Sequence, residues 1–597
     1  MMKPKANYLF EVSWEVCNKV GGIWTVVKSK IEPTISTYGE NYCLVGPYFP
    51  DKASSEFQEI LPPDSFRGVF ESLKKEGISC HFGSWLVPGE PKTILIDFSG
   101  FTSQKDIIKK ELWDSYKIDS LNSQYFDFEE PVVWSYAVGK LLEQLAPLIK
   151  GKIVAHFHEW LSGAALLYLK SRNVPIATVF TTHATMLGRT LTGSGIDLYK
   201  DMASLDPGKL CYDFKVNDKH QMETACAHNA DAFTTVSEIT GIEAEGLLKK
   251  KPDVLLPNGL DMEKFPTYED CSVKHYLFRD KIREFCLYYF SPYYYVDLEQ
   301  TLIFFIAARY EFHDKGIDVF IDALADLNQK LRESNSKKTI IAFFFIPAGA
   351  SGIKTEILEN KTRYQDIRDN IEDSMKFITQ HLLYSIISQN PIDGDSLLGA
   401  DMRQEYKRKV MALKKKTGTP PLCTHDLYNE GNDPILNSLK SHNLLNKEED
   451  KVKVVFYPIY LSGADRLLDL SYYEAMMGSH FGVFPSYYEP FGYTPLEAGA
   501  LAVPSVTTDC AGFGRFLLKE SIITNYPGIY MLRRLGKSNT EVVEELSRIL
   551  CDFSSLARQE RAENKIQAKK LANLFDWKLL IENYVRAHNL AVEKRGL

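Results

Sequence analysis

The stretch TLIFFIAARYEF, residues 301–312, predicts a buried β-strand that ends in a cation, Arg309. A helical pattern follows it, and the same alternation of apolar run and helix continues along the chain. Later runs occur at 339–349, 452–458, 481–486 and 504–509. Such alternation is typical of a parallel sheet covered by helices on both faces. The sequence therefore predicts a doubly wound α/β domain around this stretch.

An equivalent series of strands precedes it. The runs are YLFEVS (8–13), NYCLVGPYF (41–49), TILIDF (93–98), KIVAHFH (152–158), ATVFTTH (177–183), AFTTVS (232–237) and DVLLPNG (253–259). A chain of 597 residues exceeds what one hydrophobic core usually accommodates. We therefore expect two doubly wound domains in tandem, at 1–270 and 271–574.

Two segments depart from this alternation. Residues 354–420 are rich in charge, with apolar positions at helical spacing, and predict a helical insertion in the second domain. It is either a solvated helix pair packed on its own domain or an arm that joins subunits. The stretch 575–592 predicts an amphipathic helix, and we expect residues 575–597 to cross back to the first domain.

The composition excludes several classes of protein. The net charge of −8 gives no basic surface for nucleic acid. The ten cysteines form no CxxC pair, which favours reduced thiols in a cytoplasmic protein. No window offers the roughly 18 apolar residues of a membrane span, and no signal peptide is visible at the N-terminus.

Cations and glycines follow strands in both domains. Lys19, Gly21 and Gly22 lie at a strand-to-helix turn, where backbone can approach a phosphate closely or simply form a tight turn. Arg309 and Lys315 follow the carboxyl end of the 301–312 strand, where open α/β sheets bind ligands. Together they are suited to a diphosphate, although either alone could be a solvated loop residue.

The first domain also carries a histidine-rich stretch. HFHEW places His156, His158 and Glu159 after a strand, and TTHATMLGR places His183 and Arg189 after the next. No HExxH motif or further acidic cluster accompanies them, so a zinc hydrolase is disfavoured. A serine hydrolase is also disfavoured, because no GxSxG occurs. Buried, hydrogen-bonded histidines remain the plainer interpretation of His156 and His158.

The chain resembles the animal and fungal glycogen synthase family along nearly its whole length. The similar blocks occur in the family's order and approximate spacing. They are EVCNKVGGIWTVV, HFHEW, TTHATMLGR, TTVSEIT, LLPNGLD, ARYEFHDKG, PPLCTH, NDPIL, GVFPSYYEPFGYTPLE and LFDWK. Most specific is YYEPFGYTPLE, which is similar to the family's YYEPWGYTPAE.

The resemblance implies the GT-B architecture, in which two Rossmann-like domains face a cleft. It implies transfer of glucose from UDP-glucose to the non-reducing end of an α-1,4-glucan, with retention and without a metal or other cofactor. Site roles follow from the same resemblance. Arg309, Lys315 and Thr494 would hold the diphosphate; Tyr493 would lie near the nucleotide and Glu497 would bind the ribose; Glu489, Phe491 and Gly492 would line the glucose pocket; Lys19, Gly21, Gly22, Glu159, His183 and Arg189 would act from the first domain.

One region departs from the family. Its arginine-dense helix, which senses glucose 6-phosphate and phosphorylation, corresponds to RQERAENKIQAKK (558–570), where only Arg558 and Arg561 are arginines. The family's His-Glu-Phe-Gln run appears as EDCS (269–272), although His480 is retained. Arginine forks suit phosphate better than scattered lysines do. We therefore expect a constitutive or differently regulated enzyme.

Other functions stay open at this point. A related retaining glucosyltransferase could use ADP-glucose or another acceptor, and a silent glucan-binding scaffold could share the fold. The presence of every expected cation and carboxylate argues against the scaffold. As partners we expect UDP-glucose, a glycogen primer, further copies of the chain in a homotetramer and a glycogenin-like primer protein, with neither nucleic acid nor membrane.

Overall fold

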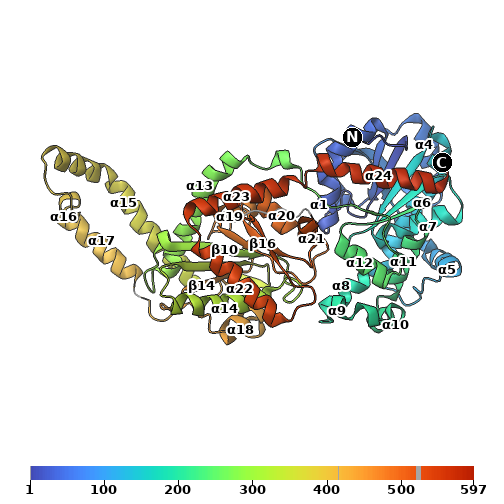
Figure 1. The fold of residues 1–597 in the computed structure, drawn as a ribbon. Coiled ribbons are helices and arrows are strands. Elements are labelled where there is room, and N and C mark those ends of the chain that lie inside the picture. The colour runs from blue at the N-terminus through green and yellow to red at the C-terminus, as the bar shows by residue number, and fades with distance from the viewer. Residues whose placement is uncertain (1, 415, 520–525) are drawn as a thin grey trace.

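The computed structural model describes residues 2–414, 416–519 and 526–597, which form two sheet domains and a projecting helical arm (Figure 1). The first sheet has the order β3-β4-β5-β2-β1-β6-β7-β8-β9 and is parallel from β5 to β9. Its strands are β1 (Tyr8–Val12), β2 (Tyr42–Pro47), β3 (Phe57–Glu59), β4 (Ser79–Trp85), β5 (Lys92–Asp97), β6 (Ile153–His158), β7 (Ala177–Thr182), β8 (Ala232–Thr235) and β9 (Val254–Leu255).

Helices cover this sheet on both faces. They are α1 (Gly22–Ser29), α2 (Ile31–Tyr38), α3 (Pro50–Glu56), α4 (Asp64–Lys75), α5 (Lys105–Tyr116), α6 (Glu130–Leu145), α7 (Gly163–Ser171), α8 (Met186–Gly193), α9 (Leu198–Asp201), α10 (Pro207–Asp213), α11 (Asn217–Asn229) and α12 (Glu238–Leu247). The central strands β6 and β7 are buried along their whole length, which explains why they appear in the sequence as continuous apolar runs.

The second sheet is entirely parallel, in the order β14-β11-β10-β15-β16-β17. Its strands are β10 (Thr301–Ala307), β11 (Thr339–Phe345), β14 (Val452–Tyr457), β15 (Phe481–Val483), β16 (Ser505–Thr508) and β17 (Ile529–Leu532). Its helices are α13 (Tyr268–Phe290), α14 (Ile317–Glu333), α18 (Pro434–Ser441), α19 (Tyr472–Gly478), α20 (Tyr493–Ala500), α21 (Gly512–Lys519), α22 (Asn539–Ser555) and α23 (Arg558–Asn573). The predicted α/β class with two doubly wound sheets is confirmed.

The predicted insertion forms an arm that projects away from the second sheet (Figure 1). It contains α15 (Thr355–Ile387), α16 (Gly394–Leu397) and α17 (Ala400–Leu413). The antiparallel pair β12 (Ala350–Ile353) and β13 (His425–Leu427) closes its base. Many apolar side chains of α15, including Leu383 and Ile387, are exposed.

The last helix, α24 (Trp577–Arg595), packs on strands β6 to β9 of the first sheet, so both chain ends lie on the first domain (Figure 1). Two chain segments therefore connect the domains, and they are hydrogen-bonded to each other. The Leu260 N–H donates to the Phe575 carbonyl at 2.9 Å, and the Trp577 N–H donates to the Leu260 carbonyl at 3.1 Å. The first of these two connecting segments leads into α13. This helix begins at Tyr268, slightly before the predicted domain boundary, and packs on α19.

Among the described residues, no helix combines the length and apolarity that crossing a bilayer requires.

Candidate active site

A cavity of about 660 Å³ lies between the carboxyl ends of the two sheets. Twelve of the residues named from the sequence line it. Gly21, Gly22, Glu159, His183 and Arg189 come from the first domain, and Arg309, Lys315, Glu489, Phe491, Gly492, Tyr493 and Thr494 come from the second. Lys19 and Glu497 do not line it. Residues far apart in the chain therefore share one cleft.

The second domain contributes two cations to this cavity. Lys315 Nζ donates to Glu489 Oε2 at 2.7 Å, and this pair is partly buried. The Arg309 side chain is 65% exposed and contacts Glu311 at 3.0 Å. A bound diphosphate could contact both cations, because both line the cavity. The exposed pair with Glu311 holds Arg309 only weakly, so this side chain is free to turn toward a ligand.

The loop after β15 leads directly into α20. Gly492 is the N-cap of this helix and has a φ of 101°, which a residue with a Cβ rarely adopts. Tyr493 and Thr494 form the first turn of α20, where backbone N–H groups have no partner within the helix. This end of α20 can therefore donate to an anionic ligand.

Glu497 lies one turn further along α20. Its Oε1 accepts from the Tyr473 hydroxyl at 2.8 Å and its Oε2 from the Tyr472 hydroxyl at 3.1 Å. Burial raises the pKa of Glu497 to about 7. A role in ribose binding stays a prediction, and it requires a ligand that reaches past the cavity wall.

The first-domain wall is organised by buried carboxylates. Glu159 Oε1 accepts from the backbone N–H groups of His183 at 2.7 Å and of Ala184 at 3.2 Å. Burial raises the pKa of Glu159 to about 7. Glu15 Oε2 likewise accepts from the N–H groups of Gly21 and Trp24, both at 2.8 Å. These carboxylates fix the backbone that faces the cleft.

Lys19 lies beside the glycine turn without pointing into the cavity. Its Nζ lies 4.9 Å from the Trp24 ring centroid, and the residue is exposed. A cation on a flexible stem over an aromatic face is held weakly. Its predicted part in closing over a ligand therefore requires a change of rotamer.

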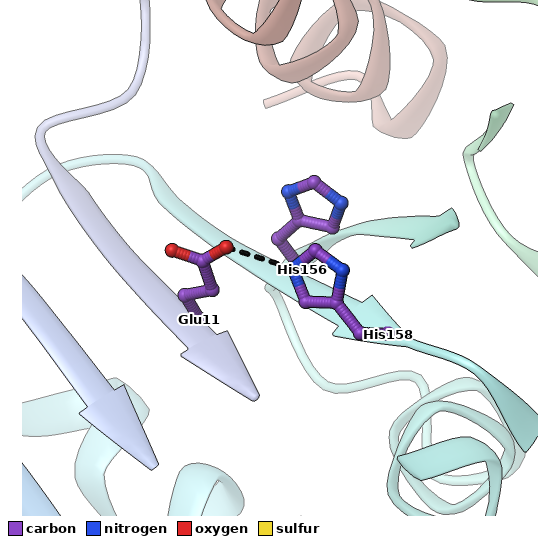
Figure 2. Close-up of side chains that lie close together, drawn as sticks. All are labelled: Glu11, His156 and His158. Atoms are coloured by element: carbon purple, nitrogen blue, oxygen red, sulfur yellow. Dashed lines mark hydrogen bonds and ion pairs between the residues drawn. The ribbon is translucent and has the colours of Figure 1, made fainter. Parts of the chain in front are cut away.

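Behind His183 lies a buried group of donors that could hold a metal: Glu11, His156 and His158, shown in Figure 2. They come from the neighbouring strands β1 and β6, and Glu11 Oε1 lies 2.7 Å from His158 Nε2. The Lys30 ammonium also pairs with Glu11 Oε1, and the Tyr42 hydroxyl donates to Oε2 at 2.5 Å. The side-chain ammonium group of Lys30 therefore already supplies the positive charge that a metal ion would bring.

The histidines of this group are also engaged with other residues. His158 Nδ1 lies 3.0 Å from His183 Nε2, and His156 Nε2 lies 2.6 Å from the Thr181 hydroxyl. Burial alone would raise the pKa of Glu11, but Lys30 and His158 outweigh it and hold that pKa well below its usual range. The donor set fits an internal ion pair that supports His183 better than it fits a metal.

A cluster of cations, formed by Arg279, Arg561 and Lys565, lies between α13 and α23. The residues named for regulation belong to this cluster or lie beside it. Burial, with Arg279 and Arg561 nearby, lowers the pKa of Lys565 to about 7. Burial and neighbouring cations also lower the pKa of Arg279 to about 10, and its Nε has no hydrogen-bond partner among the described residues. Arg558 stacks on Tyr276, 5.6 Å from the ring centroid.

His480 lies at the inner side of this cluster. Its Nδ1 accepts from the Ile303 N–H at 3.0 Å, and its ring lies 5.8 Å from that of His275. Partly buried cations that repel one another favour an anion between them. Sequence reasoning named Arg558 and Arg561 and counted Lys565 only among the scattered lysines of this helix, and it missed Arg279.

Several cavity residues were also missed by sequence reasoning. Glu15 and Asn258 lie within blocks that the family resemblance quotes, so the order of those blocks was a signal for them. Two residues outside the cavity were missed as well: Tyr488 lies within a quoted block but was given no role, whereas Glu243 lies outside the quoted blocks. Their contact joins the two domains.

The chain is similar to known proteins along nearly its whole length. The glycogen synthase family model matches residues 11–595. Over 98% of this chain, identity is 36% with the liver glycogen [starch] synthase of Mus musculus, across 83% of that protein, and 37% with isoform 2 of Saccharomyces cerevisiae, across 86%. The glycogen [starch] synthase of Dictyostelium discoideum is 37% identical, and the match spans 66% of its length.

One solved structure supports the fold alone. The catalytic domain of starch synthase IV from Arabidopsis thaliana, bound to ADP and acarbose, aligns with a TM-score of 0.51 and 11% identity, over 98% of this chain and all of that one. The GT-B fold that the sequence predicts is thereby confirmed. The resemblance seen in the sequence is likewise confirmed, and the chain belongs to the glycogen synthase family.

Proposed function

We propose that this protein is a glycogen synthase that transfers glucose from UDP-glucose to the non-reducing 4-hydroxyl of an α-1,4-glucan, with retention of configuration. The observation that carries the proposal is the single cavity in which Arg309 and Lys315 face His183 and Arg189. Fixed cations stabilise the charge that develops on a departing nucleoside diphosphate. No metal is needed for this step in the proposal.

The proposed reaction is a displacement on one face of the sugar. The bond between glucose C1 and the β-phosphate oxygen breaks while the acceptor O4 bonds to C1 from the same face. The acceptor proton passes to the departing phosphate oxygen. Glu489, at the glucose side of the cavity, orients the sugar. The side chains of both domains contribute, so the cleft must close for turnover.

Radiolabel transfer from UDP-glucose to glycogen tests this function. The parent enzyme should incorporate label, and Arg309→Ala and Glu489→Ala should each lower kcat/KM by a factor of about 100 or more. Lys338→Ala, a lysine distant in sequence from the cavity-lining residues, serves as a control. ADP-glucose in competition decides the donor: preferential transfer from ADP-glucose would contradict the proposal, and no transfer from either donor would favour a glucan-binding scaffold.

We further propose that the α15–α17 arm joins chains into a homotetramer, since the exposed apolar residues of α15 have no sheet to cover. Light scattering of the purified protein tests this, and a monomer would contradict it. A cytoplasmic location accords with ten cysteines that form no disulfide, and the primer is a glucan, with or without a glycogenin-like protein.

A further inference from the structure

The first turns of α12 hold both residues that flank Glu489. Tyr488, directly before it, donates its hydroxyl to Glu243 Oε1 at 2.9 Å. The carbonyl of Pro490, directly after it, accepts from the Ser237 hydroxyl at 2.6 Å and from Thr240 Oγ1 at 3.3 Å. Helix α12 belongs to the first domain and Glu489 to the second, so these bonds cross the cleft.

The same Glu243 oxygen also organises the first-domain wall. It accepts from the Thr185 backbone N–H at 3.2 Å and from the Thr185 hydroxyl. Thr185 is the N-cap of α8 and accepts from the Gly188 N–H at 3.0 Å. Helix α8 carries Arg189, and His183 lies just before the N-terminus of this helix. One buried carboxylate is therefore bonded to both halves of the site.

The junction is buried and closely packed. Glu243 is fully buried and Tyr488 is 3% exposed. Nearby, a Cβ on Gly512 would lie 2.4 Å from both the Pro490 carbonyl and Ser237, so the two domains meet here without a gap. From its own domain, the loop is held by the Asp314 carbonyl, which accepts from the Tyr488 N–H at 3.1 Å.

We infer that Glu243 and Tyr488 are positioning residues: closure of the cleft makes their hydrogen bond, and this bond sets the Glu489 carboxylate relative to His183 and Arg189. The inference rests on the proposed role of Glu489 in the glucose pocket. Neither residue touches the substrate, since neither lines the cavity. Their effect is confined to how the reacting groups are aligned, where small displacements cost much rate.

Three substitutions test the inference. Tyr488→Phe removes one hydroxyl and keeps the ring. We expect kcat for transfer to fall about tenfold, while affinity for UDP, measured by calorimetry, stays within about twofold of the parent. Glu243→Ala should lower kcat further. Glu243→Gln keeps an acceptor oxygen, and burial already raises the pKa of Glu243 to about 7, so this variant should recover most of the activity.

Tyr168→Phe is the matched control. Its hydroxyl donates to the Glu143 carboxylate within the first domain, away from the cavity. We expect its kcat and thermal midpoint to match the parent's, whereas Tyr488→Phe should change kcat alone. An unchanged kcat in folded Tyr488→Phe would overturn the inference, and so would equal losses of kcat and UDP affinity, which would indicate a general opening of the domains.

A double-mutant cycle separates this inference from the proposed function. If Tyr488 acts through Glu489, Tyr488→Phe should have little further effect on the residual activity of Glu489→Gln. Full additivity would overturn the positioning role. If Glu489→Gln itself retains full activity, the proposed role of Glu489 is wrong. If Glu489→Gln is inactive while Tyr488→Phe is normal, only the positioning role is wrong.

Discussion

Single residues decide how charge is buried in this protein. The Lys30–Glu11 pair lies beneath the first-domain wall, and both side chains are at most 2% exposed. Glu11 is hydrogen-bonded to His158, which is hydrogen-bonded in turn to His183. Burying two ions is costly, but leaving one of them unpaired costs more. The pair is therefore a structural requirement for the site even though it lies outside the cavity.

We predict that Lys30→Met lowers the free energy of unfolding by about 3–5 kcal/mol, because it leaves Glu11 charged, buried and unpaired. Adding Glu11→Gln should restore part of the loss. Lys5→Met is the control, since the Lys5–Glu593 pair is half exposed on both sides and should contribute less than about 1 kcal/mol. Urea denaturation measures all three, and an equal effect of the two lysine changes would contradict the prediction.

Glu497 gives a prediction about pH. Its pKa of about 7, raised from 4.5, favours the neutral acid, so its contribution to stability is full below 4.5 and is lost as the pH rises through 7. Ribose hydroxyls bind the ionised form better. The KM for UDP-glucose should therefore fall as the pH rises through 7. In Glu497→Gln the KM should be higher and should not fall as the pH rises through 7. Identical pH profiles of KM in the two proteins would disprove the role of ionised Glu497.

At the scale of elements, α13 and α23 bring together Arg279, Arg561 and Lys565, which form no salt bridge within the described part of the chain and lie close enough to disfavour one another's charge. The low pKa of Lys565 shows the cost: its contribution to stability is full above 10.5 and is lost as the pH falls through about 7. An anion bound between the helices would relieve this repulsion.

We predict that sulfate, which keeps its charge across this range, raises the thermal midpoint more below pH 7 than above it, because Lys565 is then protonated. Lys565→Met should lose this difference, whereas Lys376→Met, on the distant arm, should keep it.

Glucose 6-phosphate should bind at the same cluster of cations between α13 and α23. The sequence predicts little activation by it, and strong activation in the transfer assay would show that interpretation to be wrong.

Elements were also what the sequence predicted best. Continuous apolar runs correspond to strands buried on both faces, so β10, β11 and β14 were recognisable from residues alone. Short loop motifs placed Arg309, Lys315 and Glu489 in one cleft because parallel strands end at one edge. Glu243 and Arg279 lie outside the quoted motifs, and the motif that contains Tyr488 does not reveal its contact with Glu243, because that partner lies far away in the chain.

At the scale of the molecule, the two domains meet across a junction that leaves no room for a larger side chain. Gly512 packs against Ser237 and the Pro490 carbonyl. The cations proposed to hold the diphosphate, in contrast, belong to the second domain alone. Binding of the nucleotide and closure of the cleft can therefore be separated by substitution.

We predict that Gly512→Val acts as a wedge that keeps the domains apart. UDP should bind with an affinity within about twofold of the parent, while kcat should fall by a factor of about 100. Gly431→Val is the control, since a Cβ there meets nothing within 4 Å. Small-angle scattering should show the expanded shape, and normal turnover by a folded Gly512→Val protein would contradict the prediction.

The helix α24 has a consequence for synthesis on the ribosome. The first domain is translated before the second, yet the helix that covers β6 to β9 follows the second domain in the chain. Until that helix is made, the nascent first domain lacks Trp577 and Tyr584, both fully buried in the folded protein. One apolar face of its sheet therefore stays open to chaperones while the whole second domain emerges, and a chain that terminates before residue 577 leaves that face bare.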